Sequence, residues 1–253
     1  MHFGKSLFDT QYCMDDCQGN SVSLQVTKEE KDLGIWTDPS LKFSVHVAYA
    51  AKKAHQILGL SRRSFIFLDI SLVKQLYTVM VRPHLEYGNV VWHPQFKKDM
   101  ELLEAVQRRA TKMVPSLRNL SYEERLRCNG CMDLPCPLYR QLRGDAIETY
   151  KYLHGQYRTN YLSLFHIFDP QSGVSTRGHS LKLQKRDCKS MLRANVLGFR
   201  IVNFWNALPE DVVSAESVNC FKNRFDCHCQ HLRYSANCED FKFCSSVDRL
   251  LSL

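Results

Sequence analysis

The pattern of polar and apolar positions changes near Pro39. Before it, Ser21–Val26 alternates between polar and apolar residues, and Gly19 and Asn20 offer a turn ahead of this stretch. Gly34–Trp36 continues the extended pattern. These features predict a short β-hairpin or small sheet over residues 1–38.

After Pro39, apolar residues recur at steps of three and four, which is typical of amphipathic helices. The first such stripe consists of Phe43, Val47, Ala51, Ala54 and Leu58. Ser71 is the expected cap of a second helix, which Pro83 is expected to end. A third helix follows the stripe from Met100 to Met113, with its acids early and its bases late, as the helix dipole favours. A capping box at Ser121–Glu124 and a helix opened by Pro137 complete a predicted helical domain over residues 41–155.

The periodicity is lost between residues 156 and 188, where Asp169-Pro170, Ser172-Gly173 and Arg177-Gly178 interrupt the chain. We therefore expect a basic linker there. Helical spacing returns from Leu192 to Trp205, and Ser217 is placed to cap a last helix. This predicts C-terminal helices over 189–231 and a Cys-bearing tail over 232–253. The fold class expected is mainly α, with a short N-terminal β unit.

The composition is that of a globular chain, with 253 residues, 44% of them hydrophobic and 24% charged. The longest apolar stretches fall far short of the roughly 18 residues that span a bilayer, so no membrane partner is expected. The N-terminus lacks the basic-then-apolar order of a secretory signal, which favours an intracellular location, in the nucleus or the cytoplasm. In that setting the 11 cysteines are expected to be thiols or metal ligands rather than disulfides.

The net charge of +8 is unevenly distributed. Residues 41–68 hold five bases and no acid, and residues 177–200 hold seven bases and one acid, so these two stretches carry +5 and +6. A solvated helix face explains such runs in many proteins, whereas the sharper hypothesis is a surface that binds phosphates. The candidates for contact with a nucleic-acid backbone are Lys52, Lys53, Arg62, Arg63, Arg108, Arg109 and Lys112, followed by Lys182, Lys185, Arg186 and Lys189. Of the nearby aromatic residues Tyr49, Phe65, Phe67 and Phe199, most are expected to pack in the core rather than to stack on bases.

One string is similar to a catalytic motif. Tyr12–Asp16 looks like the Tyr-x-Asp-Asp hairpin of reverse transcriptases with one residue inserted. Polymerase chemistry requires two metal ions and a further carboxylate on a separate upstream strand, and Asp9 is the only acid that precedes Tyr12. The extra residue also reverses the facing of side chains in a strand. We therefore expect Asp15 and Asp16 to be turn residues and predict no catalytic residue.

Two groups of cysteines were considered as zinc ligands. The first is Cys128, Cys131 and Cys136, and the second is Cys220, Cys227, Cys229, Cys238 and Cys244 with His228 and His231. Neither spacing matches a standard zinc finger or knuckle. We therefore expect ordinary thiols, no metal site and no resident cofactor.

Several stretches nevertheless occur together in an order that is specific to one family. They are Met1–Gly4, Lys31–Ile35, Ser40–Val47, Tyr77–Gly88, Val91–Pro94, Leu103–Lys112, Leu120–Leu126, Arg143–Asp145, Thr176–Ser180 and Asn203–Pro209. From residue 1 to about residue 228 the chain resembles the C-terminal portion of non-LTR, LINE-type retrotransposon reverse transcriptases of the jockey-like group.

The resemblance implies a role for each part of the chain. Residues 1–33 match the hairpin that grips the primer terminus, and residues 41–127 match the thumb that holds the template–primer duplex. In the family, the palm that carries the Mg²⁺-binding aspartates precedes the matched portion, and so does an endonuclease domain. The resemblance therefore predicts a fragment of an RNA-directed DNA polymerase that contacts RNA and DNA backbones without extending a primer, with a separate polymerase palm as a further partner.

Two rival hypotheses stay open at this point. In the first, the chain is a helical protein-interaction or self-associating module, with Tyr87, Trp92, Phe204 and Trp205 partly exposed because their palm partner is absent. In the second, the C-terminal cysteines form a small metal-binding module.

Overall fold

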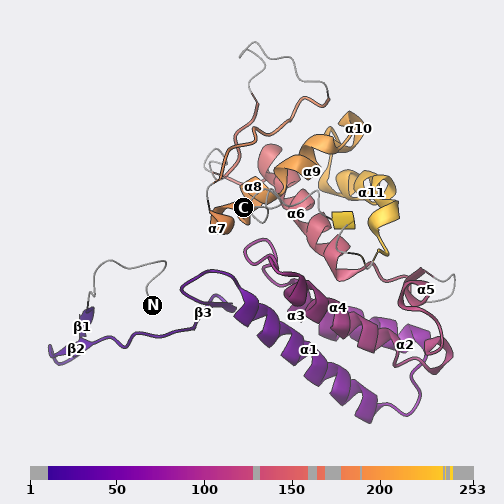
Figure 1. Cartoon of the computed structure of the whole chain (residues 1–253), viewed down its shortest axis with the longest axis horizontal. Coiled ribbons are helices and arrows are strands. Elements are labelled where there is room, and N and C mark those ends of the chain that lie inside the picture. The colour runs from indigo at the N-terminus through magenta and orange to yellow at the C-terminus, as the bar shows by residue number, and fades with distance from the viewer. Residues whose placement is uncertain are drawn as a thin grey trace.

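A computed structural model describes residues 11–127, 132–158, 164–168, 178–188, 190–235, 237 and 240–241 (Figure 1). Two small antiparallel hairpins come first: β1 (Cys13–Asp15) pairs with β2 (Ser21–Ser23), and β3 (Glu30–Asp32) pairs with β4 (Ile35–Thr37). The first hairpin lies apart from the helices, whereas the second leads into α1, where Trp36 stacks on Tyr49 at 4.5 Å. The N-terminal β unit that the sequence predicts is thus confirmed over its described residues.

The helices of the first part follow directly. They are α1 (Ser44–Ser64), α2 (Ile70–Leu76), a π-helical turn (Tyr77–Val81), α3 (Arg82–Glu86), α4 (Lys97–Thr111), a 3₁₀ turn (Pro115–Leu117), α5 (Tyr122–Arg127) and α6 (Pro137–Leu153). The predicted stripe of α1 is buried from Val47 to Leu58. The capping box is also confirmed, because the Ser121 N–H donates to Glu124 Oε2 at 2.8 Å and the Glu124 N–H donates to Ser121 Oγ at 3.3 Å. The fold is mainly α.

The second helix differs from the prediction at both ends. Its cap is Asp69, whose Oδ1 accepts from the Leu72 N–H at 2.8 Å, so Ser71 lies inside the helix. Pro83 does not end it, because the wide π turn comes first and Pro83 falls in the first turn of α3. The backbone stays helical from the π turn into α3, where the Arg82 N–H donates to the Tyr77 carbonyl, so Pro83 lies within a continuous helical stretch.

Five helices make up the C-terminal part of the described chain. They are α7 (Met191–Ala194), α8 (Leu197–Arg200), α9 (Val202–Ala207), α10 (Glu210–Val213) and α11 (Val218–His228), and a 3₁₀ turn (Gln230–Leu232) follows. Ser217 caps α11 as predicted, with its Oγ accepting from the Cys220 N–H at 3.2 Å. The Tyr150 ring of α6 stacks on Phe221 of α11 at 4.5 Å.

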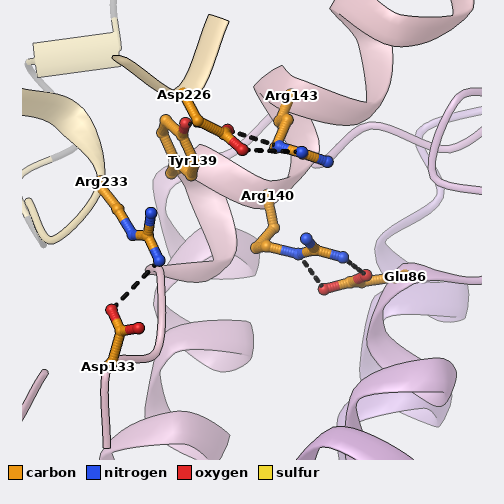
Figure 2. A network of polar contacts seen from close by, with 7 residues as sticks. All are labelled: Glu86, Asp133, Tyr139, Arg140, Arg143, Asp226 and Arg233. Atoms are coloured by element: carbon orange, nitrogen blue, oxygen red, sulfur yellow. Dashed lines mark hydrogen bonds and ion pairs between the residues drawn. The ribbon is translucent and has the colours of Figure 1, made fainter. Parts of the chain in front are cut away.

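Helix α6 is fastened on two sides by paired charges, as Figure 2 shows. Arg140 donates two hydrogen bonds to Glu86 of α3, at 2.9 and 2.7 Å. Arg143 donates two to Asp226 of α11, at 2.6 and 2.8 Å, and the Tyr139 hydroxyl donates a third to the same carboxylate. The buried residues of both parts belong to one hydrophobic core. The predicted domains at 41–155 and 189–231 are therefore packed together rather than separate.

The expectation of a linker over 156–188 needs correction. Its described segments form a bridge between Ile167 and Leu183, with the Gln184 N–H donating to the His166 carbonyl at 2.7 Å. The buried Leu183 also exchanges backbone hydrogen bonds of 2.8 Å with the Asn206 side chain of α9. These contacts make the segment part of the fold, and it was missed because isolated apolar residues leave no periodic pattern.

Three of the four aromatic residues expected at an uncovered surface are instead buried. Trp92 and Trp205 are fully buried and their indole N–H groups donate to backbone carbonyls, at 2.6 and 2.9 Å. Phe204 is buried as well, and only Tyr87 is exposed. Trp92, Phe204 and Trp205 are thus packed inside the fold rather than partly exposed.

Candidate nucleic-acid interface

Helices α1 and α4 lie side by side and run in the same direction. Near their starts the Ser44 hydroxyl donates to Asp99 Oδ2 at 2.6 Å, and further along His55 Nδ1 lies 3.4 Å from a guanidinium nitrogen of Arg109. Because these contacts pair early residues with early residues and late with late, the two helices are parallel. Their C-terminal ends, which both carry basic residues, therefore meet at the same end of the seam.

At that end the seam opens into a groove of about 910 Å³, here termed the basic groove. It is lined by Leu58, Arg62, Ala105, Arg108, Arg109, Lys112, Met113, Arg118, Leu120, Ser121, Tyr122 and Arg125. Six of these residues are Arg or Lys and none is acidic. All six except Arg125 are exposed. Three separate segments therefore place positive charge around one hollow.

The charges of the basic groove differ from those of the network in Figure 2. There, every arginine drawn faces a carboxylate. Among the described residues, none of the five exposed groove cations forms an ion pair with an acid. Clustered like charges that form no ion pairs with acids produce a local potential that attracts anions.

Tyr122 forms a wall of the groove and is held by charged groups on several sides. The guanidinium carbons of Arg108 and Arg125 lie 5.0 and 5.5 Å from the centre of its ring, within the range of cation–π attraction. Its hydroxyl donates to the buried carboxyl of Glu104 at 2.5 Å. Burial raises the pKa of Glu104 to about 7, although this hydrogen bond and the charge of Arg108 oppose the rise.

Arg125 has a structural role in the same wall. It is buried, and it donates to the Thr111 hydroxyl at 3.0 Å and to the Leu120 carbonyl at 2.5 Å. These bonds attach α5 to the end of α4. They also fix the turn that carries Arg118, so that its charge lies beside Lys112 on the lining of the groove.

The structure brings together four of the first seven predicted cations, namely Arg62, Arg108, Arg109 and Lys112. Lys52 lines a shallower hollow of the same seam, together with His55 and Arg109. With roughly 100° of rotation per residue, Arg63 lies on the Lys52 side of α1, while Lys53 lies about 180° from Arg62, on the opposite face. Lys53 is thus exposed but is not a groove residue.

The second predicted set lies elsewhere. Lys182, Lys185 and Arg186 belong to the segment packed on the C-terminal helices, and the Arg186 guanidinium lies 5.1 Å from the centre of the Phe199 ring. None of the three lines the basic groove, and Lys189 lies outside the described residues.

Arg118 and Arg125 were missed by sequence reasoning. Arg118 follows a 3₁₀ turn, so no helical period relates it to α4. Arg125 falls within a helix that begins at the capping box, and its role depends on two acceptors outside that helix. Only their positive charge, close to the end of a basic helix, could have pointed to them.

Two of the candidate metal ligands are buried thiols. Cys136 is buried at the start of α6, where its sulfur accepts from the Tyr139 N–H at 3.3 Å, and burial raises the pKa of its thiol. Burial also raises the pKa of Cys229 to about 12. In the described part of the chain, no group of three or more His, Cys, Asp or Glu residues is arranged to hold a metal ion. Of the other candidates, Cys220, Cys227, His228 and His231 lie within this part, and Cys128, Cys131, Cys238 and Cys244 lie outside it.

The two acids of the Tyr12–Asp16 string lie in the first hairpin and form contacts within it. Asp15 ends β1 opposite Ser21, and Asp16 closes the turn. Asp16 Oδ1 accepts from the backbone N–H groups of Gln18 and Asn20, at 2.8 and 2.9 Å, and Oδ2 accepts from the Asn20 side chain at 3.2 Å. These bonds hold the pKa of Asp16 below its usual value. The turn role predicted for Asp16 is confirmed, whereas Asp15, also predicted to be a turn residue, belongs to β1. Asp9 lies outside the described residues.

Comparison with known proteins gives a limited result. No family model and no solved structure matches the chain. An uncharacterized protein of Caenorhabditis elegans is 35% identical over 98 residues, which are 38% of this chain and 50% of that protein. The chain thus spans about half the length of this curated relative. Within the described residues, the helices include none with the length and apolar character needed to cross a membrane.

Proposed function

We propose that this chain is a segment of a non-LTR retrotransposon reverse transcriptase that binds the nucleic-acid backbone in the basic groove and does not itself extend a primer. The observation that carries the proposal is the convergence of five exposed cations from three segments, without acidic partners among the described residues. The ordered resemblance of residues 1–228 to this family supplies the nature of the anion, a template–primer duplex.

The arrangement favours contact with phosphates over reading of bases. Lys52, Arg109 and Lys112 follow one seam between two parallel helices, so the charges form a row rather than a closed pocket. A row of cations can follow a phosphate backbone of any sequence. The expected binding is therefore independent of sequence and strongly dependent on salt.

The absence of primer extension follows from how the acids of the N-terminal hairpin are used. Both carboxylate oxygens of Asp16 accept hydrogen bonds from the turn that it closes. Asp15 is exposed on β1, and β1 and α5 lie at opposite ends of the molecule (Figure 1). Polymerase chemistry needs several carboxylates that converge on two metal ions, and the resemblance assigns that function to the palm, which is not part of the matched portion.

Fluorescence anisotropy with RNA–DNA hybrids of unrelated sequences tests the proposal. Five phosphate contacts correspond to a slope of about −4.5 in log K against log salt, or a roughly 500-fold loss of affinity between 50 and 200 mM. The variant Arg108→Gln/Lys112→Gln should reduce the slope to about −2.7, which leaves a loss of roughly 40-fold over the same range. It should do so equally for all sequences.

The matched control is Lys53→Gln, which removes an exposed cation from the opposite face of the same helix. It should leave both affinity and slope unchanged. Binding that does not respond to salt, or an effect of Lys53→Gln as large as that of the double variant, would refute the assignment to the groove. Incorporation of nucleotides by the purified chain on a primed RNA template with Mg²⁺ would refute the claim that it does not extend a primer.

A further inference from the structure

An exposed apolar loop begins where α1 and the basic groove end. It consists of Phe65, Ile66 and Phe67, which are 41%, 93% and 84% exposed, and it follows the predicted phosphate contacts Arg62 and Arg63. The expectation that most of the aromatic residues near the charge pack in the core is therefore wrong, since Tyr49 is exposed as well. Two adjacent large apolar side chains with this degree of exposure leave an apolar patch in water, and such patches commonly mark a binding surface.

The loop is held at both ends, so its exposure is a defined feature of the fold. The Phe65 N–H donates to the Ser61 carbonyl at 3.2 Å, and Asp69 caps α2 through the Leu72 N–H. Leu68, which comes next in the chain, packs against the core. The backbone thus turns inward on either side of a tip that points outward.

A hollow of about 770 Å³ lies beside this tip. It is lined by Ile66, Phe67, Leu68, Asp69, Ile70, Ser71, Lys74, Val114, Pro115 and Ser116. Val114 directly follows Met113, which lines the basic groove, so the two hollows adjoin at the end of α4. One is bordered by cations and the other mostly by apolar groups. A ligand that extends across both hollows would combine negative charge with an apolar part.

On the basis of the proposed function, we propose that the loop Phe65–Phe67 binds an unpaired base at the end of a duplex whose backbone lies in the basic groove. A nucleotide has both required properties, a phosphate and an apolar aromatic face. Stacking of a base on an aromatic side chain is worth roughly 5- to 150-fold in affinity, whatever the base. The preferred substrate is therefore a duplex with a single-stranded extension, as a primed template has.

Two probes separate this proposal from simple backbone binding. One is a duplex with a three-nucleotide overhang, and the other is the same duplex covalently closed at both ends by ethylene-glycol linkers, with no unpaired base. The wild-type chain should bind the overhang probe at least about fivefold more tightly. The variant Ile66→Ser/Phe67→Ala should bind both probes with the affinity that the wild type shows for the closed one.

Two further variants serve as controls. Val79→Ser removes an exposed apolar side chain from the π-helical turn and should keep the full preference. Arg108→Gln/Lys112→Gln should weaken binding to both probes alike and leave their ratio unchanged. If the wild type binds neither probe, the proposed function itself is wrong.

If the wild type binds both probes equally, or if the loop variant keeps the ratio, the inference about the loop is wrong while backbone binding stands. Sedimentation of the protein without nucleic acid tests the competing occupant. Concentration-dependent association that the loop variant abolishes, with the probe ratio unchanged, would assign the patch to a second copy of the chain and overturn the proposal.

Discussion

The buried carboxyl of Glu104 should make the stability of this protein depend on pH, and Glu104→Gln is the perturbation that isolates its contribution. The side chain lies behind the basic groove, the residue is 3% exposed, and its Oε2 accepts from the Tyr122 hydroxyl. Burial raises its pKa from an ordinary value of 4.5 to about 7.

The sign of the effect follows from comparing the folded and unfolded states. Below about pH 4.5 the carboxyl is protonated in both states, and the folded state has its full stability. As the pH rises from 4.5 to 7, the carboxyl ionises in the unfolded chain but not in the folded one, so the free energy of unfolding falls. Above pH 7 the loss is complete. The difference between the folded and unfolded pKa values corresponds to a loss of about 3 kcal/mol in the free energy of unfolding. Solvent screening reduces this figure little, because the carboxyl is buried.

Glutamine keeps an acceptor for the Tyr122 hydroxyl and cannot ionise. Between pH 4.5 and 8, Glu104→Gln should therefore lose about 3 kcal/mol less of its unfolding free energy than the wild type does. Urea unfolding followed by the fluorescence of the buried Trp92 and Trp205 measures this difference. Glu101→Gln, an exposed substitution on the same helix, is the control. Parallel pH profiles for Glu104→Gln and the wild type, or an equal flattening by Glu101→Gln, would refute the reasoning.

The remaining predictions concern how the parts of the fold are held together. Arg200→Met leaves the buried Asp145 without the guanidinium that donates to it at 2.8 and 2.7 Å. Urea unfolding should show that this variant loses about 3–5 kcal/mol of unfolding free energy. Arg233→Met removes a more exposed ion pair and should lose less than about 1 kcal/mol. Equal losses would contradict a buried role for Arg200. Gly198→Ala should lower the melting temperature, because its Cβ would collide with the backbone carbonyl oxygen of Leu164. Gly59→Ala should raise the melting temperature, because its Cβ meets open space on α1 and alanine favours a helix more than glycine does. A melting temperature of Gly198→Ala at or above that of the wild type would disprove this packing.

Several helix boundaries predicted from local signals agree with the structure, whereas both ends of the second helix differ from the prediction. The stripe of α1, the capping box at Ser121–Glu124, the start of α6 at Pro137 and the cap of α11 at Ser217 are all present. Each of these features depends on residues within about four positions of one another, so the sequence specifies them without reference to the rest of the chain. The same holds for the presence of cations on the outer faces of α1 and α4.

Tertiary packing decided which of these cations lie close together. Arg62 and Lys112 share a groove because α1 and α4 are parallel, and Arg118 joins them because Arg125 attaches α5 to the end of α4. Likewise Leu183 is buried because Asn206, 23 residues away, binds its backbone. Such contacts link residues far apart in sequence, and no local period encodes them. For this protein the sequence by itself determined which segments are helical and which faces are charged, whereas only the packed structure decided which charges face the same groove.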